Sequence, residues 1–134
     1  MADTMQFDLV SPEKSLASLQ VTEVHIPGTE GDLTAMANHA PLITTIRPGI
    51  LKVLGGGEML EFAVTGGFAE VSAGATSVLA EQAVPALEMT QDLLSGLVSE
   101  ATEARDSASD AMRDVADKRL NDLIAMGAQL GLNA

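Results

Sequence analysis

The sequence predicts a mainly β N-terminal sandwich followed by a C-terminal antiparallel two-helix hairpin. Before Pro85, short apolar runs are separated by breaks that contain glycine or proline, a spacing typical of an all-β sandwich or barrel. After Pro85, apolar residues recur with the period of an α-helix, and the polar stretch RDSASD divides this part in two. We therefore expect a β-sandwich domain over residues 1–86 and a helical hairpin over residues 87–134.

The first predicted strands alternate apolar and polar residues. In MQFDLV (residues 5–10) every second residue is apolar, which predicts a strand with one buried face. In LQVTEVHI (residues 19–26) the apolar residues are odd-numbered up to Val21 and even-numbered from Val24, so we expect a β-bulge near Thr22. The runs GILKVL, MLEFAV, FAEVSA and TSVLAE predict further strands, and the glycines at 55–57 predict a hairpin turn.

The first predicted helix begins after Thr90, a residue suited to cap the free N–H groups of a helix start. The second helix is expected to begin at Ser107, because Ser107 and Asp110 have the spacing of a capping box. Gly127 and Gly131 are expected to end it. The apolar stripes of the two helices are Leu93, Leu94, Leu97, Val98 and Ala101 in the first, and Ala108, Ala111, Met112, Val115, Ala116, Leu120, Leu123 and Ile124 in the second.

Composition excludes several classes of function. The 134 residues include 19 acidic and 7 basic side chains, a net charge of −12, so we expect no binding to nucleic acid or directly to an anionic lipid surface. The chain has no cysteine, which excludes disulfides and thiolate metal sites. We find no signal-peptide pattern and no apolar run of the roughly 20 residues that a bilayer span needs, so we expect membrane attachment only through partners.

Motifs for chemistry are equally scarce. The phosphate-binding P-loop, the dinucleotide fingerprint and the GxSxG nucleophile turn are all missing. The two histidines, His25 and His39, would form a two-histidine, one-carboxylate metal set with Asp32. Histidines in such numbers are more often surface or hydrogen-bonded residues than ligands, so we expect no metal, no cofactor and no catalysis. A metal-using enzyme built on these three residues stays the alternative.

The stretch VHIPGTEGDLTAMANHAPLITTIRPGILKV resembles the N-terminal domain of the epsilon subunit of F-type ATP synthases. The family pattern is a Gly-x-x-Gly-acid-Leu turn, then His-Ala-Pro-Leu, then Pro-Gly before the next strand. FDLVSPE, TGGFAEV and VLAEQAV match further family segments, so the resemblance covers about residues 5–84. The matching residues are Gly28, Gly31, Asp32 and Leu33, then His39, Ala40, Pro41 and Leu42, then Pro48 and Gly49. We expect the loops to be shaped by Gly28, Gly31, Pro41, Pro48 and Gly49.

The resemblance implies a sandwich of about ten strands with two helices after it, in agreement with the periodicity. It implies a central-stalk subunit that binds the gamma subunit and the polar loops of the c-ring, couples proton flow to ATP synthesis and catalyses nothing itself. It also implies contacts of the helices with the alpha and beta subunits, and a peripheral place on the cytoplasmic face of the bacterial inner membrane. The alternative is a free-standing β-sandwich module that binds proteins.

The resemblance implies that Glu30, Asp32 and His39 contact the c-ring loops. Pro41 favours extended geometry in the residue before it and would present His39 on a stiff loop. Gly31 permits a tight turn, which we expect to aim Asp32 in the same direction. The other interpretation is that Asp32 and His39 form hydrogen bonds only within their own loops.

The face that binds gamma should be apolar, because a permanent partner buries hydrophobic surface. Met36, Ile43 and Ile46 flank the loop that carries His39, and we expect the two isoleucines to lie in the core.

Two features of the C-terminal part depart from the family. Members that bind ATP carry an Ile/Leu-Asp-x-x-Arg-Ala motif, but here Thr90 replaces the aspartate and Leu93 the arginine, so we expect no ATP site. Members whose helices extend to inhibit hydrolysis use basic residues, whereas here acidic residues accompany the basic ones, with an Asp114–Lys118 pair expected. We therefore expect the hairpin to stay folded on the sandwich. The leucines expected to be buried there are Leu93, Leu97, Leu120 and Leu123.

Overall fold

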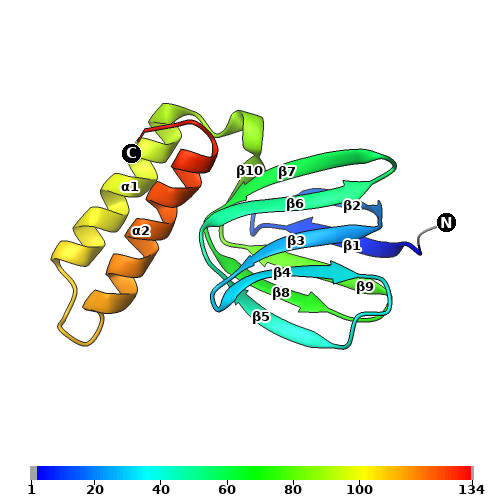
Figure 1. Cartoon of the computed structure of the whole chain (residues 1–134). Coiled ribbons are helices and arrows are strands. Elements are labelled where there is room, and N and C mark those ends of the chain that lie inside the picture. The colour runs from blue at the N-terminus through cyan, green and yellow to red at the C-terminus, as the bar shows by residue number, and fades with distance from the viewer. Residues whose placement is uncertain (1–2, 134) are drawn as a thin grey trace.

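The computed structural model describes residues 3–133 and shows ten strands, a short 3-10 turn and two helices (Figure 1). The strands are β1 (Met5–Val10), β2 (Ser15–Val21), β3 (Glu23–Gly28), β4 (Gly31–Met36), β5 (Leu42–Ile46), β6 (Gly49–Gly55), β7 (Glu58–Val64), β8 (Gly67–Val71), β9 (Ala75–Ala80) and β10 (Ala83–Pro85). The turn η1 (Ala86–Glu88) leads into α1 (Gln91–Asp106), and α2 (Arg113–Gln129) returns beside it. The predicted fold class, a ten-stranded sandwich followed by a helical hairpin, is confirmed.

The strands form two layers of one hydrogen-bonded sheet. Their hydrogen-bonding order is β10-β7-β6-β3-β5-β8-β9-β1-β2, and β4 pairs with β3 outside this path. β1 runs parallel to β9, whereas its pairing with β2 is antiparallel. β3 meets β5 through a single residue pair, Gly28 with Ile46, and at this corner the sheet passes from one layer to the other (Figure 1). Among the described residues, no helix is both long and apolar enough to cross a bilayer.

The core lies between the two layers and is aliphatic. Met5, Phe7 and Leu9 of β1 are fully buried, which confirms the face predicted from their alternation. Thr76 of β9 is the polar residue that joins them, and its hydroxyl donates to Sδ of Met5 at 3.4 Å. Burial of each large apolar side chain contributes roughly 1.5–3 kcal/mol, so this layer of side chains supports the sandwich without Trp or Tyr.

The shift of apolar phase near Thr22 is not a β-bulge, as we had expected. Thr22 instead separates two strands: β2 pairs with β1 in one layer, whereas β3 pairs with β4 and β6 in the other. The N–H and the hydroxyl of Thr22 both donate to the Leu54 carbonyl, at 2.8 and 3.0 Å. The buried side chains change from odd-numbered to even-numbered positions because the chain crosses from one layer to the other. Each strand then faces the shared core from its own layer.

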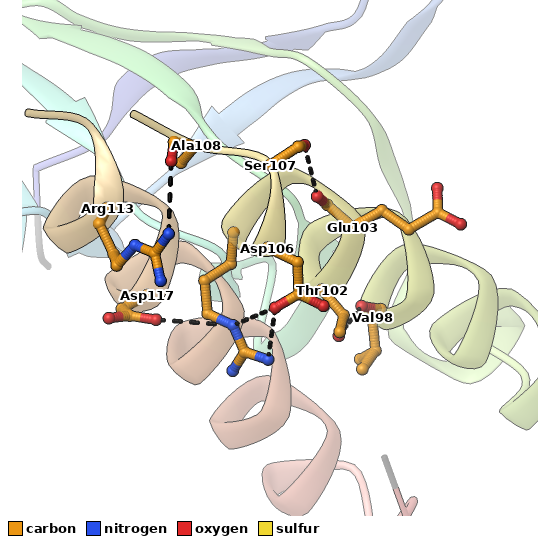
Figure 2. A network of polar contacts seen from close by, with 9 residues as sticks. Val98, Thr102, Glu103, Asp106, Ser107, Ala108, Arg113 and Asp117 are labelled. Carbon is orange, nitrogen blue, oxygen red and sulfur yellow. Dashed lines mark hydrogen bonds and ion pairs between the residues drawn. The ribbon is translucent and has the colours of Figure 1, made fainter. Parts of the chain in front are cut away.

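The helical hairpin confirms one predicted helix start and corrects the other. Thr90 caps α1, and its hydroxyl accepts a hydrogen bond from the N–H of Leu93 at 3.2 Å. Ser107 does not cap α2, because its hydroxyl donates back to the Glu103 carbonyl at 2.7 Å and belongs to the end of α1 (Figure 2). α2 therefore begins later than predicted, with Met112 at the N-cap position and no side-chain cap. The expected stripe residues Met112, Val115 and Ile124 are exposed.

Gly127 lies inside α2, not at its end, where α2 comes close to α1. A Cβ atom at this position would lie 2.5 Å from Cδ2 of Leu94, which is fully buried. The helix ends where predicted at Gly131, whose φ of 75° suits a residue after a helix C-terminus. In the first turn of α1, Leu94 is buried because it lies on the side of the helix that faces α2. Leu93, which we expected to be buried, is exposed.

We expect Gly127→Ala to destabilise the chain, because overlap of the new methyl group with the buried Leu94 side chain costs about 1–3 kcal/mol and outweighs the roughly 0.5–1 kcal/mol that alanine gains inside a helix. Gly96→Ala is the matched control, since Gly96 lies in α1 and a Cβ there meets nothing within 4 Å. This control should stabilise by about 0.5–1 kcal/mol through helix propensity. Urea denaturation followed by circular dichroism measures both, and equal effects of the two alanines would contradict the close contact at Gly127.

Candidate functional site: two contact surfaces

The turn that carries Glu30 and Asp32 joins β3 to β4. Gly28 pairs with Gly31, and Thr29 and Glu30 form the exposed tip between them. Gly31, in this turn, has a φ of 130°, which L-residues rarely adopt. Gly28 is required for a different reason: a Cβ there would lie 2.6 Å from the Gly31 carbonyl oxygen. Both glycines therefore shape the turn.

Arg47 fixes the orientation of Asp32, and the sequence reasoning missed this role. Nη2 of Arg47 lies 2.5 Å from Oδ1 of Asp32, and Nη1 donates to the Gly28 carbonyl at 2.6 Å. The backbone N–H of Arg47 donates to the Pro27 carbonyl at 2.9 Å, so this residue ties the turn to the β5–β6 connection. The Asp32 side chain is 79% exposed, so the carboxylate remains accessible to a partner despite its ion pair.

The same connection shows why Pro48 and Gly49 shape the neighbouring loop. Gly49 begins β6 against β3, and a Cβ on it would lie 2.8 Å from Cβ of Pro27. Pro48 is buried beside it, directly after Arg47. These two residues bring the backbone of Arg47 close enough to Pro27 and Gly28 to hold the turn.

His39 lies at the other end of β4 from Asp32, which corrects the expectation that both are aimed the same way. β4 pairs with β3 along its whole length, residues 31–36 (Figure 1). An extended strand rises about 3.3 Å per residue, so β4 separates Asp32 from His39. Asn38, with a φ of 69°, turns the chain after β4. Nδ1 of His39 lies 2.6 Å from the Ala40 carbonyl oxygen, a contact within its own loop just before Pro41.

The alternative metal set of His25, His39 and Asp32 is not assembled. His25 lies on β3 with Nε2 3.3 Å from a Glu23 carboxylate oxygen, whereas His39 follows the far end of β4. Within residues 3–133 no group of three or more His, Cys, Asp or Glu side chains is placed to hold a metal ion.

A second surface, on the outer face of β5, β8 and β9, exposes three large apolar side chains, with the exposed Glu70 of β8 opposite Ile43 of β5. Phe68 and Leu79 face each other across β8 and β9 and are 48% and 47% exposed. Ile43 of β5 lies on the same face and is 70% exposed, which corrects our expectation that it belongs to the core; Ile46 is buried as expected. Ile43 is exposed because it alternates with inward-facing residues on a strand whose outer face is not covered by any other element in the described part of the chain. We call Ile43, Phe68 and Leu79 the β8–β9 patch.

Alternation in the sequence showed that these strands have two faces, but it did not show which face stays uncovered. The helices pack against the opposite layer, where α2 meets β6, and leave the β8–β9 patch open (Figure 1). A shallow groove beside the patch is lined by Val10, Pro12, Ile46, Gly66 and Arg119 as well as by Phe68 and Leu79. Exposed apolar side chains that gather on one face of a small protein mark an interaction surface.

A sandwich with an exposed acidic turn and exposed apolar side chains on one face is typical of the class of proteins that bind other proteins. The chain belongs to the ATP synthase delta/epsilon family: the family described as ATP synthase, Delta/Epsilon chain, beta-sandwich domain matches residues 4–86. This confirms the resemblance seen in the sequence.

Relatives match over nearly the whole chain. The ATP synthase epsilon chain 1 of Cereibacter sphaeroides is 52% identical over 131 residues, with 98% of this chain and 99% of that protein covered. The ATP synthase epsilon chain of Paracoccus denitrificans is 48% identical over 140 residues, with 99% and 95% covered. The match therefore includes the helical hairpin as well as the sandwich.

Solved structures share the fold. A chain in the cryo-EM structure of Euglena gracilis mitochondrial ATP synthase, with OSCP, F1 and the c-ring, has a TM-score of 0.74 and 26% identity over 95% of this chain and 81% of that chain. A chain in the central stalk and c-ring structure of the Tetrahymena thermophila mitochondrial ATP synthase has a TM-score of 0.59 at 19% identity, covering 89% and 98%, and shows the fold alone.

Proposed function

We propose that this chain is the epsilon subunit of the central stalk of an F-type ATP synthase, that it links gamma to the c-ring, and that it catalyses no reaction itself. The observation that carries the proposal is the match over 98% of this chain and 99% of an ATP synthase epsilon chain. In this role, residues 1–86 supply the contacts with gamma and the c-ring, and residues 87–134 form the helical hairpin. The complex holds the subunit at the cytoplasmic face of the bacterial inner membrane.

The β8–β9 patch supports the contact with gamma. Stable interfaces have an apolar centre, and an aromatic residue near that centre supplies much of the binding energy. Phe68 is one of only three phenylalanines in a chain without Trp or Tyr, and it is half exposed. The patch offers gamma its one aromatic anchor among the exposed large apolar side chains of residues 3–133, with Ile43 and Leu79 beside it.

The outer edge of β4 supports the contact with the c-ring. Within residues 3–133, β4 pairs with β3 on one side only, so its other edge offers backbone groups to a partner. Glu30 and Asp32 mark one end of this edge and His39 the other. A ring loop with a basic residue can pair with the exposed carboxylate of Asp32, whose position Arg47 holds.

Cross-linking tests this edge residue by residue, because the chain has no cysteine of its own. Glu30→Cys, Asp32→Cys and His39→Cys, made one at a time and carrying a photoreactive label, should each form an adduct with the c subunit in the assembled synthase. Met59→Cys, at an exposed site of β7, is the control and should form no adduct with the c subunit. A residue that reacts only with gamma, or with no subunit, does not face the ring.

Co-purification tests the proposal as a whole. A tagged chain expressed in a bacterium such as Cereibacter sphaeroides should recover gamma and the rest of the ATP synthase from a detergent extract of that bacterium. Recovery of the chain alone would remove the stalk role and favour the alternative, a free-standing binding module.

We expect no heat of ATP binding at millimolar ATP in isothermal titration calorimetry. Thr90 accepts a hydrogen bond from the Leu93 N–H at the start of α1, and neither residue carries a positive charge that could replace the arginine needed to pair bidentately with phosphate. Heat of binding that saturates with ATP would contradict this and would require another site.

We propose that the hairpin stays folded on the sandwich and inhibits hydrolysis weakly or not at all. Within residues 3–133, three of the four basic residues of the helices, Arg105, Lys118 and Arg119, form ion pairs. Arg105 lies 3.1 Å from Asp106 and 3.8 Å from Asp117. Lys118 lies 2.8 Å from Asp122, which replaces the pair with Asp114 that we had expected. The helices therefore present few unpaired positive charges to an acidic partner.

A further inference from the structure

A pocket lies between α1 and the strands β7 and β10 of the sandwich (Figure 1). Its volume is about 350 Å³, within the range of roughly 300–1,000 Å³ that is usual for binding pockets. Ala63 and Val84 line it from the sandwich, and Leu93 and Leu97 line it from α1. These walls are apolar and leave room for a side chain of aromatic size.

Thr65, directly after β7, supplies a polar group to this pocket. Its side chain is buried, and its hydroxyl is the one buried side-chain polar group that has no hydrogen-bond partner within residues 3–133. The backbone of Thr65 is satisfied, because its N–H donates to the Gln82 carbonyl at 3.1 Å and its carbonyl accepts from Nη1 of Arg119 at 2.8 Å. An unpaired buried hydroxyl destabilises a fold, so a polar group that enters the pocket gains by pairing with it.

The lining of the pocket selects a neutral polar group carried on an apolar body. The charged residues of the lining, Glu13, Lys14 and Glu81, are exposed and lie at the mouth. A charged group deeper inside would meet only a neutral hydroxyl and apolar walls, which cannot compensate the loss of its hydration. A phenol suits the pocket, because its ring is apolar and its hydroxyl both donates and accepts. This chain has no Tyr, so a phenol must come from another molecule.

The mouth of the pocket is continuous with the surface that we propose for gamma. Ser11, Pro12 and Glu81 line this pocket and also the groove beside Phe68 and Leu79. A partner seated on the β8–β9 patch therefore lies next to the pocket, and a side chain from that partner can enter it without a second docking surface.

We propose that the pocket receives a tyrosine side chain of the gamma subunit, whose hydroxyl pairs with Oγ1 of Thr65. The inference rests on the proposed function, because it needs gamma on the β8–β9 patch. The pocket then adds a polar anchor to an interface whose centre at Phe68 is apolar. A phenylalanine in the same place would leave the Thr65 hydroxyl unpaired, so the pocket distinguishes the two residues by one hydrogen bond.

A small phenol tests the pocket on the purified chain alone. In an NMR titration, p-cresol, which is the tyrosine side chain without its backbone, should shift the amide signals of Ala63, Val84 and Leu93 until they saturate. Thr65→Val keeps the shape of the side chain and removes the hydroxyl. It should weaken p-cresol binding about three- to tenfold, the usual effect of one neutral hydrogen bond, and leave toluene binding within about twofold.

Thr4→Val is the matched control. It removes an exposed hydroxyl at the other end of β1 from Ser11 and should leave the binding of both probes unchanged. A saturating shift that is absent, or a Thr65→Val protein that binds p-cresol as well as the natural chain does, would overturn the inference.

A stability measurement separates this role from a structural one. Thr65→Val should not lower the urea concentration at the midpoint of unfolding, because the hydroxyl has no partner in residues 3–133 to lose. A clearly lower midpoint would show that the hydroxyl is paired within the fold, and this would also overturn the inference.

Binding to immobilised gamma tests the occupant. Thr65→Val should weaken the affinity for gamma about three- to tenfold, Thr4→Val should leave it within about twofold, and saturating p-cresol should compete with gamma for the natural chain. If gamma binds the natural and Thr65→Val chains equally well and p-cresol does not compete, its tyrosine does not enter the pocket, although the stalk role stands. If gamma does not bind the natural chain at all, the proposed function and this contact both fail.

Discussion

Gly67→Ala is expected to cost the sandwich more than about 4 kcal/mol of unfolding free energy, enough to leave little folded protein. A Cβ at this position would lie 2.1 Å from the carbonyl oxygen of Leu79 and 2.9 Å from Cα of Ala80. Both are backbone atoms of β9, which is hydrogen-bonded to β8 and to β1, so they cannot move aside without breaking the sheet. The φ of 133° adds backbone strain for any residue with a side chain. Soluble yield and urea denaturation measure the effect.

Gly74→Ala is the control for this prediction. Gly74 lies in the turn before β9, a Cβ there meets nothing within 4 Å, and its φ is not positive. We expect its stability to stay within about 0.5 kcal/mol of the natural chain. A Gly67→Ala protein as stable as Gly74→Ala would show that β8 and β9 do not approach each other as closely as described.

Phe68→Glu is expected to weaken binding to purified gamma by about 100-fold or more while the chain stays folded. Phe68 is 48% exposed, so the sandwich loses little core packing, whereas a desolvated carboxylate at the centre of an apolar interface costs several kcal/mol. Biolayer interferometry with immobilised gamma measures the affinity, and circular dichroism checks the fold.

Met59→Glu is the matched control for the patch. Met59 is also 48% exposed but lies on β7, in the other layer of the sandwich. The Met59→Glu protein should bind gamma with an affinity within about twofold of that of the natural chain, because the same charge is added at a position outside the patch. Undiminished binding by Phe68→Glu, or an equal loss in both variants, would show that gamma docks elsewhere.

Local patterns in the sequence predicted most of the elements. The alternation in β1 identified its buried face, and Thr90 marked the start of α1 because a hydroxyl can cap free N–H groups within one turn. Gly31 and Gly131 were recognised because positive φ is a property of one residue and its immediate neighbours. The family resemblance likewise rests on short segments whose residues stand close together in the chain.

The sequence by itself therefore determined the fold class, the order of the elements and the family. The tertiary structure decided which surfaces stay uncovered and which distant groups meet. Periodicity could not show that Thr22 lies between two layers, that β4 separates Asp32 from His39, or that Ile43 faces outward. Arg47 and Arg119 acquire their partners only when segments far apart in the chain come together. Periodicity reports which side of a strand or helix is apolar, but packing decides what that side contacts.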